Sequence, residues 1–348
     1  MPRRSSSRRP GPLAAAALAI TAVLALFIFM PWVNAMRFSG KPTTVGIHRG
    51  TGFRQIADKL HDAGIIRFRW PLLLTGALIP DLHKIKPGRY TVPSGLSTFQ
   101  LLQRLHASPQ DEVRLMIPNG VEQTKIAAIV SANLDIDSTA FMAASRDRNL
   151  LSSLGIKGES TEGYLFPGTY NFPWASSPRE VIAFLVGRFR TFYADSLQRE
   201  AATAGLDERQ MMTMASIVEA ETPLDTEKPV IASVYLNRLK KNMRLQADPT
   251  VQYAIPGPAR RLWFKDLAVE SPYNTYIHPG LPPGPICNPG SESIMAVLRP
   301  ANTSFIYFVA TGKGGHLFAS TLAAHDRNVL HYRASTRNQP DTAGRSSR

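Results

Sequence analysis

Two glutamates beside an apolar run are the residues of this chain best placed to do chemistry. Glu219 and Glu221 follow the segment Met211 to Val218, which contains no charged side chain. Burial in low dielectric disfavours the charged form of a carboxyl group, so a glutamate there can keep its proton and act as an acid. The alternative is a half-exposed helix end whose glutamates are solvated.

The helix that carries these glutamates must position them, and Asp207 is a good N-cap for it. Glu219 and Glu221 are two residues apart, which corresponds to about 200° of rotation on a helix. We therefore expect only one of them to face a cleft, and the periodicity does not show which one.

Three polar residues further along alternate with apolar ones. Arg244, Gln246 and Asp248 would share one face of an extended segment, where they could contact a ligand or orient the glutamate. Asp248 also precedes Pro249, a pair typical of a helix start, so a capping role is the alternative.

A second cluster combines aromatic and amide side chains. Tyr273, Asn274 and Tyr276 are either sugar contacts or packing residues, and Glu162 is either a distant cleft carboxylate or a surface residue. The segment 278–290 holds five prolines and three glycines, and such a stiff loop can shape a cleft. Within it, Asn288 is predicted to cap a helix that ends near Leu298.

Carboxylates beside tyrosine, asparagine and Pro/Gly-rich loops are typical of sites for sugar polymers. Glycosidic cleavage by water or through a covalent intermediate needs two carboxylates. A lyase needs one acid, which protonates the leaving oxygen while the sugar's own hydroxyl closes onto the anomeric carbon.

Other chemistries find little support in the sequence. The eight histidines include no His-Glu-x-x-His motif and the single Cys287 allows no paired spacing, so we expect no metal site and no cofactor. Cys287 as a nucleophile with His278 is an alternative, but a small residue in a Pro/Gly-rich loop is the interpretation we favour. The net charge of +14 suits an anionic polymer or a membrane surface, and no nucleic-acid-binding motif is present.

The N-terminus is predicted to be a membrane anchor. Basic residues (Arg3, Arg4, Arg8, Arg9) precede the uncharged run Leu13 to Met30, which is long enough to span a membrane as a helix. Because no comparable basic cluster follows at once, we place the N-terminus in the cytoplasm and the rest outside. The competing interpretation is a cleavable signal peptide.

A weak internal repeat follows the predicted anchor. Three times an extended segment ends in a glycine turn (Gly50, Gly95, Gly120) and leads into an amphipathic helix. No catalytic group recurs in the repeat. We therefore interpret 45–134 as small α/β modules that position or bind, without an active site.

Several motifs in fixed order closely resemble the YceG-like family of membrane-anchored endolytic murein transglycosylases. They are Ala215–Thr222, Asn237–Leu239, Met243–Val251, Tyr273–Tyr276, Gly280–Ile286 and the segment 307–310, within a match over about 43–333. The family's catalytic glutamate falls on Glu219. Glu221 then either faces solvent, which we favour, or contacts Glu219 without touching the substrate.

The resemblance implies cleavage of MurNAc–GlcNAc bonds inside nascent peptidoglycan strands, which leaves 1,6-anhydroMurNAc ends and terminates strand elongation. It also implies penicillin-binding proteins or other peptidoglycan synthases as partners, and a LysM-like region before the catalytic part. A protein of another class, a non-catalytic peptidoglycan-binding scaffold for cell-wall synthases, is the alternative.

These observations predict an α+β protein at the cytoplasmic (inner) membrane with its catalytic domain in the periplasm. The expected parts are a cytoplasmic basic segment (1–12), a single transmembrane helix (13–33), a LysM-like α/β module (43–135), a mixed α/β catalytic domain (136–333) and a disordered tail (334–348).

Overall fold

A computed structural model describes residues 12–35, 40–107, 111–312 and 314–337, and the predicted basic segment and most of the predicted tail lie outside these residues. The chain divides into two compact units. Unit 1 contains residues 1–114, 133–135 and 171–176, and unit 2 contains 115–132, 136–170 and 177–348. The mixed α+β architecture expected from the sequence is confirmed.

Unit 1 begins with the apolar helix α1 (Pro12–Phe29), which is followed by the short helix α2 (Pro31–Asn34). The mean hydropathy of α1 is 2.5, and its length and composition suffice to cross a membrane. A signal sequence near an N-terminus has the same properties, so the two interpretations made from the sequence both remain.

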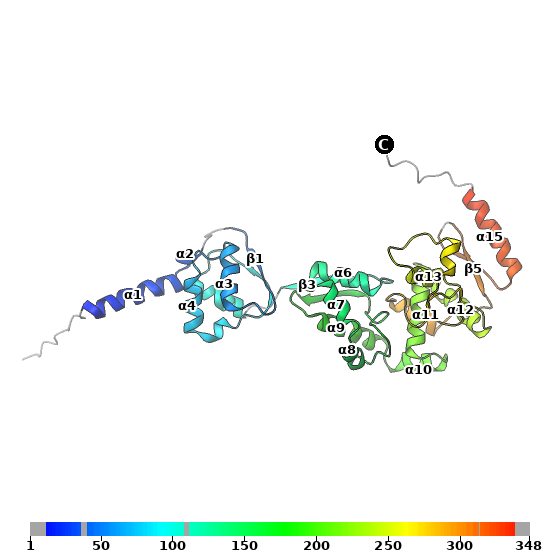
Figure 1. The fold of residues 1–348 in the computed structure, drawn as a ribbon, viewed down its shortest axis with the longest axis horizontal. Helices are drawn as coiled ribbons and strands as arrows, with labels where there is room; N and C mark the ends of the chain where they lie inside the picture. The colour runs from blue at the N-terminus through cyan, green and yellow to red at the C-terminus, as the bar shows by residue number, and fades with distance from the viewer. Residues whose placement is uncertain (1–11, 36–39, 108–110, 313, 338–348) are drawn as a thin grey trace, which may run out of the picture. The chain divides into compact units, whose positions relative to one another are not determined.

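The rest of unit 1 is a small sheet covered by helices (Figure 1). Strand β1 (Thr43–Ile47) pairs antiparallel with β2 (Gly88–Val92), and Val45 lies opposite Tyr90. The remaining elements are α3 (Phe53–Asp62), α4 (Trp70–Leu78), the 3-10 helix η1 (Pro80–His83) and α5 (Thr98–Ala107). Ile56, Leu60 and Leu102 belong to the core that they enclose.

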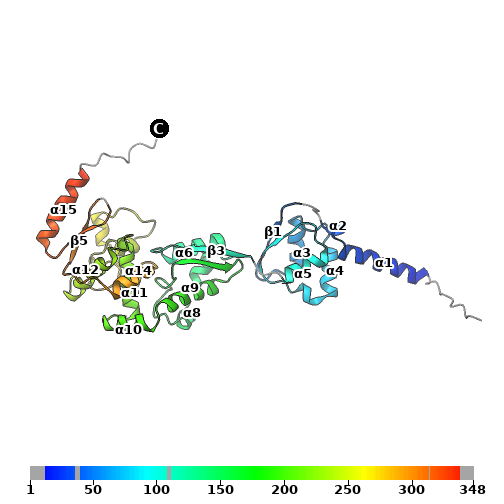
Figure 2. The same ribbon diagram turned by 180° about the vertical axis from the view of Figure 1, so that it is seen from behind.

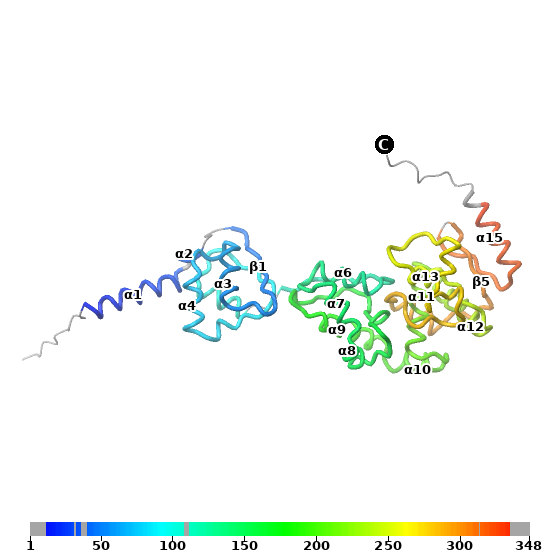
Figure 3. The backbone as a smooth tube through the Cα atoms, viewed as in Figure 1, coloured from blue at the N-terminus to red at the C-terminus, as the bar shows by residue number. Residues whose placement is uncertain are grey.

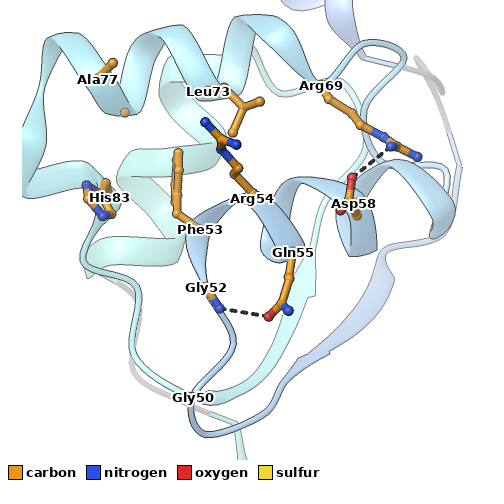
Figure 4. A pocket seen from close by; sticks show the side chains of 11 residues that line it. Gly50, Gly52, Phe53, Arg54, Gln55, Asp58, Arg69, Leu73, Ala77 and His83 are labelled. Carbon is orange, nitrogen blue, oxygen red and sulfur yellow. Dashed lines mark hydrogen bonds and ion pairs between the residues drawn. The ribbon is translucent and has the colours of Figure 1, made fainter.

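A pocket of about 1100 Å³ opens between α3, α4 and η1 (Figure 4). The ion pair between Arg69 and Asp58 (2.8 Å) lies at its edge, and the ring of Phe53 forms part of its wall. Gly76 of α4 lets that ring approach closely, because a Cβ atom at Gly76 would lie 2.4 Å from it. The pocket therefore combines charged and apolar walls.

The predicted repeat is present in all three places. Gly50, Gly95 and Gly120 each follow a strand, precede a helix and have φ near +80°, +81° and +72°, a conformation that favours glycine. The third copy consists of β3 (Glu112–Ile117) and α6 (Gln123–Asn133), and β3 pairs with β4 (Gly168–Pro173).

Unit 2 is mainly helical around a mixed core. Its further elements are α7 (Ser138–Ala144), α8 (Arg148–Ser153), α9 (Pro178–Phe192), α10 (Asp195–Thr203), α11 (Glu208–Glu221), α12 (Lys228–Lys240), α13 (Asp248–Ala254), η2 (Phe264–Ala268), α14 (Ser291–Leu298), β5 (Tyr307–Ala310), β6 (His316–Ala319) and α15 (Leu322–Arg337). Helix α11 packs against α12, α13 and α14, and Figure 3 labels α11, α12 and α13. These four helices position the site.

The segment 178–204 forms two helices and not one continuous helix. The chain breaks at Tyr193, between α9 and α10, and the fully buried Tyr193 ring stacks on Phe189. Helix α15 continues to Arg337 and so enters the segment from 334 for which we expected disorder.

Candidate active site

Helix α11 carries Glu219 and Glu221 to the mouth of a cleft. As predicted, Asp207 caps the helix: its carboxylate accepts a hydrogen bond from the backbone N–H of Gln210. All residues from Met211 to Val218 are buried, and the backbone becomes extended at Thr222. The apolar run therefore serves as the core of unit 2, and the two glutamates occupy the last turn.

The cleft has a volume of about 950 Å³. It is walled by the end of α11, the start of α13, the loop before η2, the Pro/Gly-rich loop and the turn of the third repeat. Its lining residues are Asn119, Gly120, Glu122, Glu219, Ala220, Glu221, Thr222, Pro223, Asp248, Pro249, Gln252, Tyr253, Ala259, Arg260, Arg261, Leu262, Ile286 and Cys287. The third copy of the repeat, for which we expected a positioning or binding role without an active site of its own, therefore supplies part of the cleft wall.

The Glu219 carboxylate is held by three donors. Its Oε2 atom accepts hydrogen bonds from Ser293 Oγ (2.6 Å) and from the backbone N–H of Gly290 (3.0 Å). Lys228 Nζ lies 3.4 Å from both carboxylate oxygens. The side chain is only 7% exposed. The carboxyl group of Glu219 is thus buried, as expected from the sequence, but its surroundings are not only apolar, because polar groups of Lys228, Gly290 and Ser293 contact it.

Lys228 is a buried cation beneath the cleft. Its side chain is 2% exposed and also contacts Asp225 Oδ1 at 2.7 Å. A buried ammonium group needs acceptors to compensate for the loss of water: the Asp225 carboxylate supplies the closest one, and the carboxyl oxygens of Glu219 accept more distant hydrogen bonds. The same contacts restrict the rotamer of Glu219.

Glu221 also lines the cleft, so the prediction that only one glutamate faces it is wrong. Its carboxylate accepts a hydrogen bond from the Tyr235 hydroxyl of α12, and it is not solvent-facing as we expected. The 200° argument fails because Glu221 is the last helical residue, where a side chain can reach around the helix end. Burial raises the pKa of Glu221 to about 7, while the hydrogen bond from Tyr235 acts in the opposite direction.

Asp248 is the member of the predicted polar face that reaches the cleft. Its carboxylate accepts a hydrogen bond from the Tyr276 hydroxyl at 2.5 Å. Ala247, and not Asp248, occupies the N-cap position of α13, so the alternative capping role is not observed. Tyr276 does not line the cleft itself, but its hydrogen bond orients Asp248, which does.

The other predicted contact residues lie outside that set. Arg244 and Gln246 are exposed and Leu245 and Ala247 buried, as the alternation predicted, although Gln246 has φ +49° and the segment is no regular strand. Asn274 is fully buried and donates to the carbonyls of Leu267 and Val269, so it holds a loop together and does not face a ligand.

Tyr273 lines a separate pocket of about 270 Å³. That pocket also contains Glu162, Arg209 and the prolines Pro283 and Pro285. The cluster 273–276 is thus divided between two places and does not form one contact surface.

Glu162 lies at the centre of a buried hydrogen-bond network behind the cleft. Its carboxyl group accepts hydrogen bonds from the backbone N–H of Gln123 (3.0 Å) and from Asn288 Nδ2 (2.9 Å). Asn288 Oδ1 accepts from the backbone N–H of Leu165, and its carbonyl accepts from Gly120. Asn288 therefore ties three distant segments together and does not cap α14, whose N-cap is Gly290.

Glu162 gives a prediction for the pH dependence of stability. Burial raises the pKa of its carboxyl group from 4.5 to about 8, while the hydrogen bonds from Gln123 and Asn288 lower it. Because the folded protein binds this proton more tightly, its contribution to stability is full below about pH 4.5 and is lost as the pH rises through about 8.

Replacement of Glu162 by glutamine isolates this effect. We expect the free energy of unfolding of the wild type, minus that of Glu162→Gln, to fall by an amount on the order of a few kcal/mol between about pH 5 and about pH 9. Denaturant titrations of the full chain in detergent measure the difference. A difference that stays constant with pH would show that the carboxyl group is ionised throughout.

Neither a metal site nor a reactive thiol is found at the cleft. Within residues 12–35, 40–107, 111–312 and 314–337, no group of three or more His, Cys, Asp or Glu side chains could hold a metal ion. Cys287 is 3% exposed, and burial raises the pKa of its thiol well above the usual value. His278 is exposed, so the alternative of a Cys287 nucleophile has no support.

The sequence interpretation missed Lys228, Gly290 and Ser293, which contact Glu219. One signal was available for Lys228: it is a cation at the start of a helix whose buried residues are apolar or hydroxylic from there up to Arg238. Gly290 and Ser293 lie more than seventy residues from Glu219 in the chain. Their contact with it depends on tertiary packing.

The fold and cleft together define a class: an α+β protein with a carboxylate at a helix end, facing a cleft bounded by a stiff Pro/Gly-rich loop. The chain belongs to the YceG-like family, which it matches over residues 45–331. The resemblance inferred from the motifs is thereby confirmed.

Relatives and one solved structure are similar over most of the chain. An endolytic murein transglycosylase of Bacillus subtilis is 31% identical, over 84% of this chain and 86% of its own. An endolytic murein transglycosylase of Streptococcus pneumoniae R6 is 28% identical, over 84% of this chain and 59% of its own. The crystal structure of a YceG-like protein from Listeria monocytogenes is 30% identical, with a TM-score of 0.57, and covers 83% of this chain and 99% of that chain.

Proposed function

We propose that this chain is an endolytic lytic transglycosylase that cleaves MurNAc–GlcNAc bonds within peptidoglycan strands. The observation that carries the proposal is the position of Glu219, a carboxylate oriented by Ser293 and Gly290 at the wall of a cleft of about 950 Å³. Family membership and the names of the relatives support the same enzyme class.

Glu219 acts first as an acid and then as a base. Its proton passes to the glycosidic oxygen as the bond to the anomeric carbon breaks. The 6-hydroxyl of the same MurNAc residue attacks that carbon and returns its proton to the carboxylate. Oε2 accepts hydrogen bonds from Ser293, Gly290 and Lys228, whereas Oε1 accepts one only from Lys228 among the described residues, so we assign both proton transfers to Oε1.

Substrate contacts are assigned by position around the cleft. Asp248 lines it and is oriented by Tyr276, and carboxylates commonly accept hydrogen bonds from sugar hydroxyls. Arg244, Gln246 and Tyr273 are proposed as contacts for parts of the strand that extend beyond the cleft. The exposed Trp263 and Phe264, which sequence reasoning missed, adjoin the lining residues and offer apolar surface to sugar rings.

The finer cellular assignments belong to the same proposal. We place α1 in the cytoplasmic (inner) membrane as a single-pass anchor, with unit 2 in the periplasm. Cleavage of nascent strands there would terminate their elongation beside penicillin-binding proteins or other peptidoglycan synthases. Unit 1 would be the LysM-like module, and its pocket beside Arg69 and Phe53 would hold glycan.

Product analysis tests the proposal. We expect the full chain in detergent to release fragments with 1,6-anhydroMurNAc ends from purified sacculi, and mass spectrometry measures those ends. A protein that binds sacculi but leaves their composition unchanged would be the non-catalytic scaffold. Fragments with reducing MurNAc ends would instead indicate a hydrolase.

A further inference from the structure

Only the last turns of the apolar helix α1 contact the rest of unit 1. From Pro12 to Val23 its described residues are exposed, whereas Leu24 and Phe27 are half-buried and Ile28 is buried. The Phe27 ring lies 4.9 Å from the Trp70 ring and 6.0 Å from the Phe68 ring, between centroids. The rest of unit 1 therefore contacts the apolar helix before that helix ends.

The length of α1 determines how deep in a membrane this contact would lie. Its 18 residues span roughly 27 Å at ~1.5 Å per residue, which is close to the ~30 Å thickness of the hydrocarbon layer. The exposed part up to Val23 covers only about two thirds of that distance. If α1 crosses the membrane, Phe27 must lie at membrane depth, and so must the side chains that touch it.

The surface beside α1 has the composition of a membrane interface. The exposed apolar side chains Phe68 (41%), Trp70 (40%), Leu78 (66%) and Ile79 (37%) belong to α4 and its two ends. Figures 1 and 2 both show α4 at the end of unit 1 from which α1 projects. Aromatic residues at this level, next to the basic Arg67, are typical of proteins that contact lipid headgroups.

Hydrogen bonds fix the orientation of α1 relative to the rest of unit 1. Asn34, which is 1% exposed, donates to Thr98 Oγ1 (2.9 Å) and accepts from the backbone N–H of Phe68 (2.8 Å). Thr98 Oγ1 in turn donates to the carbonyl of Phe27 (3.2 Å). Because α1 and α4 are joined through these contacts, the depth of one determines the depth of the other.

We infer that unit 1 lies on the outer surface of the membrane, with Phe68, Trp70, Leu78 and Ile79 at the level of the headgroups. The partner of this surface is the lipid bilayer. The inference rests on the membrane anchor in the proposed function. Beyond that anchor, the inference states that unit 1 itself contacts the bilayer and is not separated from it by a flexible linker.

Nitroxide labels on single cysteines test this placement in proteoliposomes of the full chain. Leu78→Cys reports on the surface and Ala19→Cys on α1. Thr44→Cys is the control, because Thr44 is exposed and belongs to β1, a strand that both views draw at the end of unit 1 away from α1. Cys287→Ala removes the native thiol. We expect the ratio of collisions with oxygen to collisions with a water-soluble nickel chelate to be several-fold higher at Leu78 than at Thr44.

The outcomes separate the inference from the anchor on which it rests. If the label at Ala19 is exposed to lipid but the label at Leu78 is as accessible to the nickel chelate as the label at Thr44, the inference is overturned and the anchor remains intact. Labels at Ala19 and Leu78 that are both accessible to the nickel chelate would overturn the inference and the membrane anchor. A label at Leu78 shielded from both reagents would indicate a protein partner and would also overturn the inference.

Discussion

Glu219→Gln is expected to reduce the rate of strand cleavage by roughly 10²–10⁴-fold, the usual contribution of a general acid. Glutamine has nearly the same shape and can still accept hydrogen bonds from Ser293 and Gly290, but it has no proton to give and cannot take one back. Release of anhydro-muropeptides from sacculi by the full chain measures the effect.

Glu270→Gln is the matched control for this substitution, because Glu270 is an exposed residue of unit 2 that does not line the cleft. It should retain wild-type activity. Binding of sacculi should survive in both variants, since the cleft walls are unchanged. Wild-type activity in Glu219→Gln would exclude Glu219 as the acid and direct attention to Glu221, the other carboxyl group at the end of α11.

Asn288→Ala is expected to lower the free energy of unfolding by a few kcal/mol and to abolish most of the activity. The substitution leaves the buried N–H of Leu165 without its acceptor and removes one donor from Glu162. Each buried polar group without a partner costs roughly 1–3 kcal/mol. The midpoint of urea denaturation of the full chain should therefore shift to lower concentration.

Activity should also fall because Asn288 fixes the loop that presents Gly290 to Glu219. Asn302→Ala is the control, since Asn302 is exposed and lies outside the cleft, and it should change neither quantity. An Asn288→Ala variant with unchanged stability would mean that the loop is held by its backbone hydrogen bonds alone.

The sequence predicted local structure well because local patterns determine it. The apolar run before Glu219, the cap at Asp207 and the glycine turns at Gly50, Gly95 and Gly120 each act over a few residues. Turns with positive φ favour glycine strongly enough to be recognised without a structure. Helix α11 and the three repeats were therefore predictable.

The surroundings of the carboxyl groups could not be predicted in the same way. Glu219 meets Lys228 from α12 and Ser293 from α14, and Glu162 meets Asn288 across 126 residues of chain. Such pairs depend on how helices pack, which a single sequence does not encode in any local pattern. The tendency of buried charges to be paired could have suggested a partner for Glu219, but not its identity.

The position of Glu221 shows a different limit. Helical periodicity assumes that the helix continues, whereas α11 ends at this residue. Helix ends are the least certain part of any prediction from sequence. A carboxyl group with a pKa raised to about 7 thus lies in the cleft, although we expected Glu221 to face solvent once Glu219 was taken as the catalytic residue.

Cleavage in water enriched in oxygen-18 is the measurement that tests the central claim most directly. If Glu219 directs the 6-hydroxyl of the substrate onto the anomeric carbon, the new MurNAc ends contain no oxygen from the solvent and are lighter by one water than hydrolysis products. Mass spectrometry of the fragments should show unlabelled anhydro ends. Oxygen-18 at the new ends would contradict the account, because water would then be the nucleophile.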